Sequence, residues 1–264
     1  MEDTVRLAER RKLKMYLYAL GVLIFFALIA IIVTAKNEKK ENQNKDTTIV
    51  STTQAETTEA ATEPQTTIEV PTGDVDGYHS NVIAIDAGHG GHSGCTYDGV
   101  YEDDINFAIA KKLEKQLQDV GFQTIMIRED EGPGWVVKKR AEIANEEKVG
   151  LYLSIHVNSE GNTSNGKYHG IETWYNSTKG DDTKRLAELV QKHVIAQTGS
   201  KDRKAVVENQ FIVIKDTKMP SCLLEVGFLT NPEERKKMQT EDFRNQVAVG
   251  MKDAVLEYWG ILPQ

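Results

Sequence analysis

The sequence predicts a three-layer α/β fold, with a mainly parallel central sheet flanked by helices. Three observations predict it. From about residue 81, short apolar runs typical of buried strands alternate with longer segments whose apolar residues recur at helical spacing. The intervening helices have ten or more residues, which favours parallel pairing of the strands. The folded part has about 180 residues, a length that suits one such domain.

In the first half of this domain, strand patterns and helix patterns alternate regularly. The run NVIAID is apolar and stops at Ala87-Gly88, as expected for a buried strand. The next segment places Ile105, Ile109 and Leu113 on one helical face, and Gly121 follows where a helix commonly ends. FQTIMIR and GLYLSI then have the character of strands, with a helical pattern between them. The expected elements are strand 81–86, helix 103–119, strand 122–128, helix 136–147 and strand 150–155.

The second half continues the alternation. Leu186, Val190 and Val194 face one side of an expected helix, and the last segment is amphipathic. The short apolar runs on either side of them are expected strands. In order, we expect strand 171–175, helix 183–197, strands 211–214 and 222–226, and helix 242–259.

A single transmembrane helix is expected before this domain. Residues 15–35 contain no Asp, Glu, Lys or Arg, and a helix of 21 residues would span the hydrocarbon layer of about 30 Å. Residues 1–14 carry five basic residues, so the positive-inside rule makes them a cytoplasmic tail and places the domain that follows outside a cell membrane. A cleaved signal peptide is the competing interpretation, but its apolar core is normally shorter.

Residues 36–79 are expected to form a disordered linker. Nine threonines occupy the 22 positions from 46 to 67, and such a segment buries too little apolar surface to offset its ordering entropy. The expected folded domain, residues 80–264, follows this linker.

The net charge of −8, without a basic stripe, argues against nucleic acid as a partner. Cys95 and Cys222 could pair, or either could be an isolated thiol.

Two of the expected strands end in histidine. His89 lies in a glycine-rich turn after the first strand, and His156 follows the third. Functional sites in open α/β sheets form beyond the carboxyl ends of strands, so both should lie at one rim, with Glu102 at the start of the next helix. Two imidazoles and one carboxylate match a catalytic zinc site with one open position. Glu225, at the end of a later strand, could take a proton from the attacking water.

Other assignments remain open at this point. Each histidine, taken alone, could be a structural residue hydrogen-bonded to backbone. His92 is a rival ligand in the same glycine-rich loop, and His169 is a weaker one. Asp98 and Asp103 are the alternative carboxylates.

At these residues the chain resembles the zinc-dependent N-acetylmuramoyl-L-alanine amidases, a family often called amidase type 3. The family block D-P-G-H-G-G matches residues 86–91, with Ala87 in place of proline. The S-I-H-x-N block matches residues 154–158, and the E-x-G-F-[LI]-[ST]-N block matches residues 225–231. Asp103 follows Glu102, where the family usually has lysine. The likeness extends over about residues 81–260.

The resemblance implies that His89, Glu102 and His156 bind Zn²⁺ and that Glu225 is the catalytic acid/base. It also implies a peptidoglycan substrate, cut between N-acetylmuramic acid and L-alanine. Some relatives carry a long insertion that an activator must displace. Only a short segment, 161–167, stands there in this chain, so we expect an open site without an obligatory activator. A wall-binding module without turnover and a stem-peptide metallopeptidase are the alternatives.

Overall fold

The computed structural model describes residues 69–160 and 166–262. Three predicted segments lie outside the described residues and stay predictions: the cytoplasmic tail 1–14, the transmembrane helix 15–35 and residues 36–68 of the linker. Within the described ranges, no helix combines the length and the hydropathy needed to cross a bilayer.

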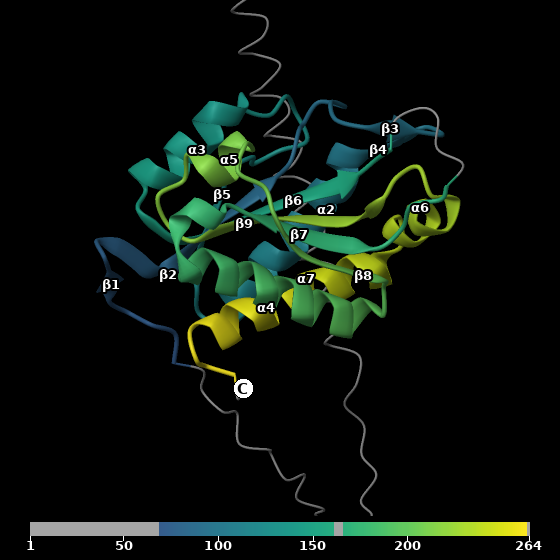
Figure 1. Cartoon of the computed structure of the whole chain (residues 1–264). Coiled ribbons are helices and arrows are strands. Elements are labelled where there is room, and N and C mark those ends of the chain that lie inside the picture. The colour runs from purple at the N-terminus through teal and green to yellow at the C-terminus, as the bar shows by residue number, and fades with distance from the viewer. Residues whose placement is uncertain (1–68, 161–165, 263–264) are drawn as a thin grey trace, which may run out of the picture. The chain divides into compact units, whose positions relative to one another are not determined.

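A seven-stranded mixed sheet forms the centre of this unit (Figure 1). Four neighbouring strands are parallel, and the reversal occurs where β7 pairs antiparallel with β9. The path runs β1-β2-β6-β9-β7-β8, and β5 lies off this path and pairs with residues 82–85 of β2. The bounds are β1 Asp74–Val75, β2 Tyr78–Ala87, β5 Gln123–Met126, β6 Val149–Asn158, β7 Ile171–Tyr175, β8 Asp202–Val207 and β9 Ser221–Phe228. A separate small hairpin consists of β3, Thr96–Tyr97, and β4, Val100–Tyr101.

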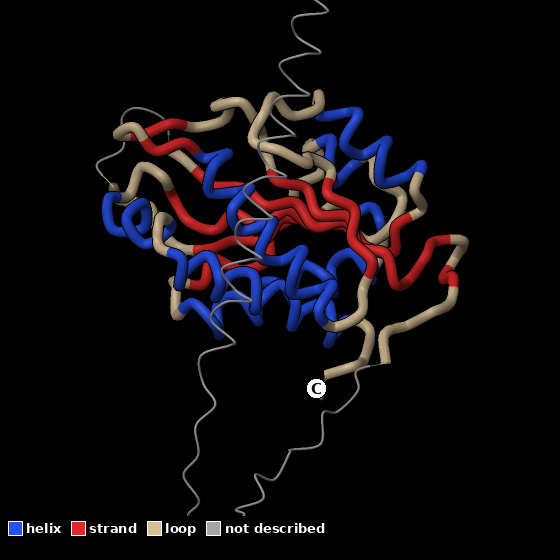
Figure 2. The backbone as a smooth tube through the Cα atoms, turned by 180° about the vertical axis from the view of Figure 1, so that it is seen from behind, coloured by secondary structure: helices blue, strands red, loops and turns tan. Residues whose placement is uncertain are grey.

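Helices cover both faces of the sheet, as the three-layer prediction requires (Figures 1 and 2). The larger layer contains α2 (Glu102–Asp119), α4 (Asp181–Thr198) and α7 (Glu241–Tyr258). The opposite layer contains α3 (Val137–Glu146) and the short α5 (Ile212–Lys215). Two further turns of helix, η1 (Ser177–Lys179) and α6 (Pro232–Met238), lie in connections.

The apolar patterns explain why these elements form. The central parts of β2 and β6, residues 82–85 and 151–153, are continuous apolar runs, as expected where both faces of a strand are covered, and Ile83, Ile85 and Leu153 have no exposed surface. In α2 the residues spaced at one helical face, including Ile109 and Leu113, are completely buried against this sheet.

The structure differs from the sequence-based expectation at several places, three of which have a plain reason. The predicted strand 211–214 is instead helix α5, because a four-residue apolar run does not distinguish a strand from one buried turn of helix. β8 was missed, since DRKAVV at the sheet edge lacks an apolar run. Residues 74–75 and 78–79, which fall in the predicted linker, belong to β1 and β2.

Candidate active site

The candidate site lies at the carboxyl ends of β2, β6 and β9. His89 follows β2 by two residues, and His156 is near the end of β6. Glu225 on β9 pairs in register with His156, so the two residues are neighbours across adjacent parallel strands. This rim is the edge of the sheet at which the sequence predicted the functional residues to meet.

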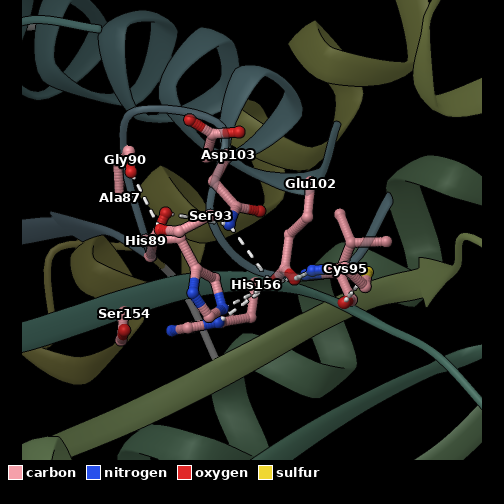
Figure 3. Close-up of polar contacts among 12 residues, drawn as sticks. Ala87, His89, Gly90, Ser93, Cys95, Glu102, Asp103, Ser154 and His156 are labelled. Carbon is pink, nitrogen blue, oxygen red and sulfur yellow. Dashed lines mark hydrogen bonds and ion pairs between the residues drawn. The ribbon is translucent and has the colours of Figure 1, made fainter. Parts of the chain in front are cut away.

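Glu102 completes a cluster with the two histidines (Figure 3). It is the first residue of α2, and its backbone amide donates to Cys95 O at 3.0 Å, which fixes the helix start at this rim. Its Oε1 lies 3.2 Å from His89 Nε2 and 3.1 Å from His156 Nδ1. One ligand atom from each of the three side chains lies within 4.8 Å of the others. The structure therefore brings the three predicted metal ligands together.

The Glu102 carboxylate is buried and well supplied with donors. Oε1 accepts from the Val157 amide at 3.1 Å, and Oε2 accepts from the Cys95 amide at 2.8 Å. Burial alone would raise the pKa of Glu102, but hydrogen bonds and charge from His156 and His89 outweigh it and hold the pKa below its usual range. This carboxylate is thus kept ionised, the state in which it can bind a cation.

Glu225 has the opposite environment. Its side chain is buried, and its Oε2 has no hydrogen-bond partner among the described residues. Burial, followed by the negative charges of Glu102 and of Glu172 on the neighbouring strand β7, raises the pKa of Glu225 well above its usual value. A buried, unpartnered carboxyl with a raised pKa suits a group that takes up and releases a proton.

Glycines allow the close approach around the histidines. A Cβ at Gly88 would lie 2.3 Å from the His156 ring, and one at Gly94 would lie 2.7 Å from both Glu102 and the His89 ring. His89 itself adopts a φ of +63°, a conformation that L-residues with a side chain rarely adopt. The absence of side-chain bulk that the sequence indicated here is therefore required by the packing of the site.

A buried ion pair holds the His89 loop in place. Arg140 Nη1 lies 2.6 Å from Asp86 Oδ1, and the second oxygen of Asp86 accepts from Tyr152 at 2.6 Å. Arg140 also donates to the carbonyls of His89 and, at 2.9 Å, Trp135. It therefore joins the loop that carries a candidate metal ligand to the segment that precedes α3.

Gly134 makes this junction possible. A Cβ at this position would lie 2.1 Å from the His89 carbonyl oxygen and 2.2 Å from an Arg140 nitrogen. The backbone before α3 can therefore lie against the His89 loop only because residue 134 has no side chain.

A cleft of about 650 Å³ opens over these residues. His89, His156 and Glu225 line it at the carboxyl rim, and Trp135 and Phe211 line it from the α3–α5 layer. This volume is in the usual range for ligand sites. The cleft can therefore admit a substrate to the three candidate ligands and the candidate base.

The rival residues lie apart from the cluster. His92 is mostly exposed and stacks on Tyr101 at 4.1 Å between ring centroids. Asp98 pairs with Arg235 at 3.2 Å, and Asp103 accepts from the His92 amide at 2.9 Å. His169 is exposed. The geometry favours His89 over His92 and Glu102 over both aspartates.

Some residues at the site were missed as functional candidates in the sequence. Asn106, one helical turn after Glu102, donates to Gly88 O at 3.2 Å and to Glu102 at 3.4 Å. Its polarity on the buried face of a helix was the available signal. Trp135 and Phe211 gave no such signal, because single apolar residues in loops are common. Cys95 and Cys222 are both free thiols.

The fold and the site define an α/β protein with a candidate metal centre next to a buried carboxyl that is a candidate acid/base. A family model described as N-acetylmuramoyl-L-alanine amidase, Amidase_3, matches residues 83–257. The chain therefore belongs to the N-acetylmuramoyl-L-alanine amidase family, as the resemblance implied.

Individual relatives agree with this assignment. The amidase LytC of Bacillus subtilis is 33% identical over 179 residues, which cover 67% of this chain and 35% of LytC. The uncharacterized protein YqiI of the same organism is 32% identical and is covered to 84%. A crystal structure of an N-acetylmuramoyl-L-alanine amidase from Clostridium difficile 630 shares 38% identity and a TM-score of 0.63, covering 67% of this chain and 95% of that chain.

Proposed function

We propose that this chain is a zinc-dependent N-acetylmuramoyl-L-alanine amidase, which hydrolyses the amide between the lactyl group of N-acetylmuramic acid and the first L-alanine of peptidoglycan. The observation that carries the proposal is the cluster of His89, Glu102 and His156, within 4.8 Å, next to the buried carboxyl of Glu225. Family membership supports the substrate and the bond that is cut.

The donor set fits zinc. Two imidazoles and one carboxylate are a common set of protein ligands in catalytic zinc sites, which leave one coordination position open. The unpartnered Oε2 of Glu225 adds a free acceptor on the neighbouring strand. When bound, zinc would supply Lewis acidity at the scissile carbonyl and lower the pKa of water.

The residues of the site have three proposed roles: binding the cation, transferring the proton and orienting the Glu102 carboxylate. Glu102 stays ionised and, with His89 and His156, holds the cation in the cleft. Glu225 accepts the proton of the attacking water, and then delivers it to the amide nitrogen of the leaving stem peptide. Asn106 and the backbone amides of Cys95 and Val157 orient the Glu102 carboxylate, as outer hydrogen bonds do in many metal sites.

We also propose that the site works without an obligatory activator. The support is the exposure of the His89 side chain, 34%, among the described residues. The open site would differ from a relative that has a partner: the CwlD amidase from Clostridioides difficile, 27% identical with a TM-score of 0.61, was solved in complex with the GerS lipoprotein.

We also propose that residues 15–35 tether this chain to the cell membrane.

The test uses the full chain and dye-labelled peptidoglycan, with and without a chelator, followed by mass spectrometry of the products. We expect chelator-sensitive dye release and intact stem peptides that begin with L-alanine. Cleavage inside the stem peptide would instead identify a metallopeptidase. Equal release with and without chelator would rule out the metal-dependent reaction, and release only after addition of a partner protein would rule out the open site.

A further inference from the structure

One wall of the cleft is unusually apolar for an exposed surface. Among the described residues, nine large apolar side chains are exposed, and five of them line this cleft. Trp135 is 56% exposed and Phe211 is 36% exposed. Trp174, on β7, lies against Phe211 with 4.7 Å between ring centroids. We call Trp135, Trp174 and Phe211 the aromatic wall.

The backbone of the aromatic wall is held by hydrogen bonds. The Trp135 carbonyl accepts from Arg140 Nε at 2.9 Å, and Phe211 O accepts from the amides of Ile214 at 3.1 Å and Lys215 at 2.8 Å. Trp174 belongs to the central sheet. Exposed aromatic side chains on such a fixed frame are presented to a ligand at little conformational cost.

Charge distinguishes the two halves of the substrate. The glycan strand of peptidoglycan is neutral around its sugar rings, whereas the stem peptide carries carboxylates. Arg140 is the one Lys or Arg among the described residues that line the cleft, and it is buried and bonded to Asp86 and to backbone carbonyls. The aromatic wall thus offers no free cation to a carboxylate.

We propose that the aromatic wall is the glycan subsite, which holds the C–H face of an N-acetylated sugar of the glycan strand next to the scissile amide. The faces of aromatic rings are electron-rich and attract the weakly positive C–H groups of a sugar face, while the sugar hydroxyls stay in water. The cleft of about 650 Å³ has room for a ligand of this size. This inference rests on the proposed function, because it assigns one half of that substrate.

Binding to the full chain is measured by ligand-observed NMR titration with two probes. One is the disaccharide of N-acetylglucosamine, which has no carboxylate that could reach a metal. The other is the tripeptide L-alanyl-D-glutamyl-L-lysine. Trp135→Ala and Phe211→Ala remove rings from the wall, and Trp135→Phe retains a ring. Tyr168→Ala is the control, because Tyr168 is an exposed aromatic residue outside the cleft lining.

We expect the disaccharide to bind the parent chain and Tyr168→Ala equally. Affinity should fall about threefold to tenfold in Trp135→Ala and Phe211→Ala, and Trp135→Phe should recover most of it. The affinity for the tripeptide should be the same in the parent chain and in all four variants. No disaccharide binding, unchanged affinity in both alanine variants, or loss of tripeptide binding instead would overturn the proposal.

Thermal unfolding of each variant separates a local effect from a folding defect. If Trp135→Ala folds poorly, Phe211→Ala still tests the removal of a ring from the aromatic wall.

The failure of this proposal can be distinguished from the failure of the proposed function. Amide cleavage with no disaccharide binding defeats the glycan subsite alone. Disaccharide binding without cleavage of the muramoyl amide defeats the proposed reaction, and the wall would then be a glycan-binding surface.

Discussion

Two buried glutamates, Glu102 and Glu225, lie at the same rim of the sheet in opposite environments. Glu102 accepts hydrogen bonds from two backbone amides and lies against two imidazoles, and its pKa is lowered. Glu225 has an oxygen without a partner, and its pKa is raised by burial and by neighbouring carboxylates. Chemically identical side chains thus have pKa values shifted in opposite directions by their surroundings.

The largest effect is expected when the proposed acid/base, Glu225, is replaced. Glu225→Gln keeps the shape of the side chain but removes the ability to accept a proton. Turnover of peptidoglycan should fall about 10³-fold, within the usual range for loss of a general acid/base. Zinc content, measured by elemental analysis of the dialysed protein, should equal that of the parent chain. Activity within tenfold of the parent would remove the contrast between the two glutamates.

A second variant, Glu102→Gln, should show the reverse pattern. Removal of the negative charge from the candidate ligand should weaken zinc binding by at least about 100-fold, since even outer residues of metal sites contribute about 10–100-fold. Competition with a chromogenic chelator measures this affinity. Asp98→Asn is the matched control, because it neutralises the alternative carboxylate, which is exposed. Metal loss in Asp98→Asn and retention in Glu102→Gln would reverse the assignment.

The smallest effect concerns stability. An unfolded glutamate ionises near pH 4.3. Because the pKa of Glu225 is raised in the folded state, the unfolded state binds fewer protons between that pH and the raised pKa, so this group makes stability fall as pH rises. Glu225→Gln removes this loss of stability, because glutamine does not ionise. In metal-free protein, its Tm should exceed that of the parent by an amount that grows from pH 4 to pH 8, on the order of a few degrees.

Differential scanning calorimetry in the presence of chelator measures this difference. Glu233→Gln, which neutralises an exposed carboxylate on α6, controls for the general effect of removing one negative charge. A Tm difference between the parent and Glu225→Gln that shrinks with rising pH would contradict the raised pKa.

Much of this arrangement could be predicted from the sequence. Strand-end histidines and a glutamate at a helix start belong to elements with strong patterns, and parallel strands bring their carboxyl ends to one edge. Asn106 carried one signal, a polar side chain on the buried face of a helix. Arg140 and the aromatic wall could not be found in this way. Their roles depend on contacts between segments far apart in the chain, such as the Arg140–Asp86 pair, and no local periodicity encodes such contacts. The reversed direction of β7 likewise depends on tertiary pairing with β9.

Gly134 allows close packing at one side of the cleft. Because a Cβ at residue 134 would lie 2.1 Å from the His89 carbonyl oxygen, glycine there allows the segment that carries Trp135 to approach the loop that carries a candidate metal ligand. A side chain at 134 would require one of the two segments to move, and with it the position of Trp135 in the cleft. A substitution at residue 134 would therefore alter this part of the cleft without removing any of the candidate metal ligands.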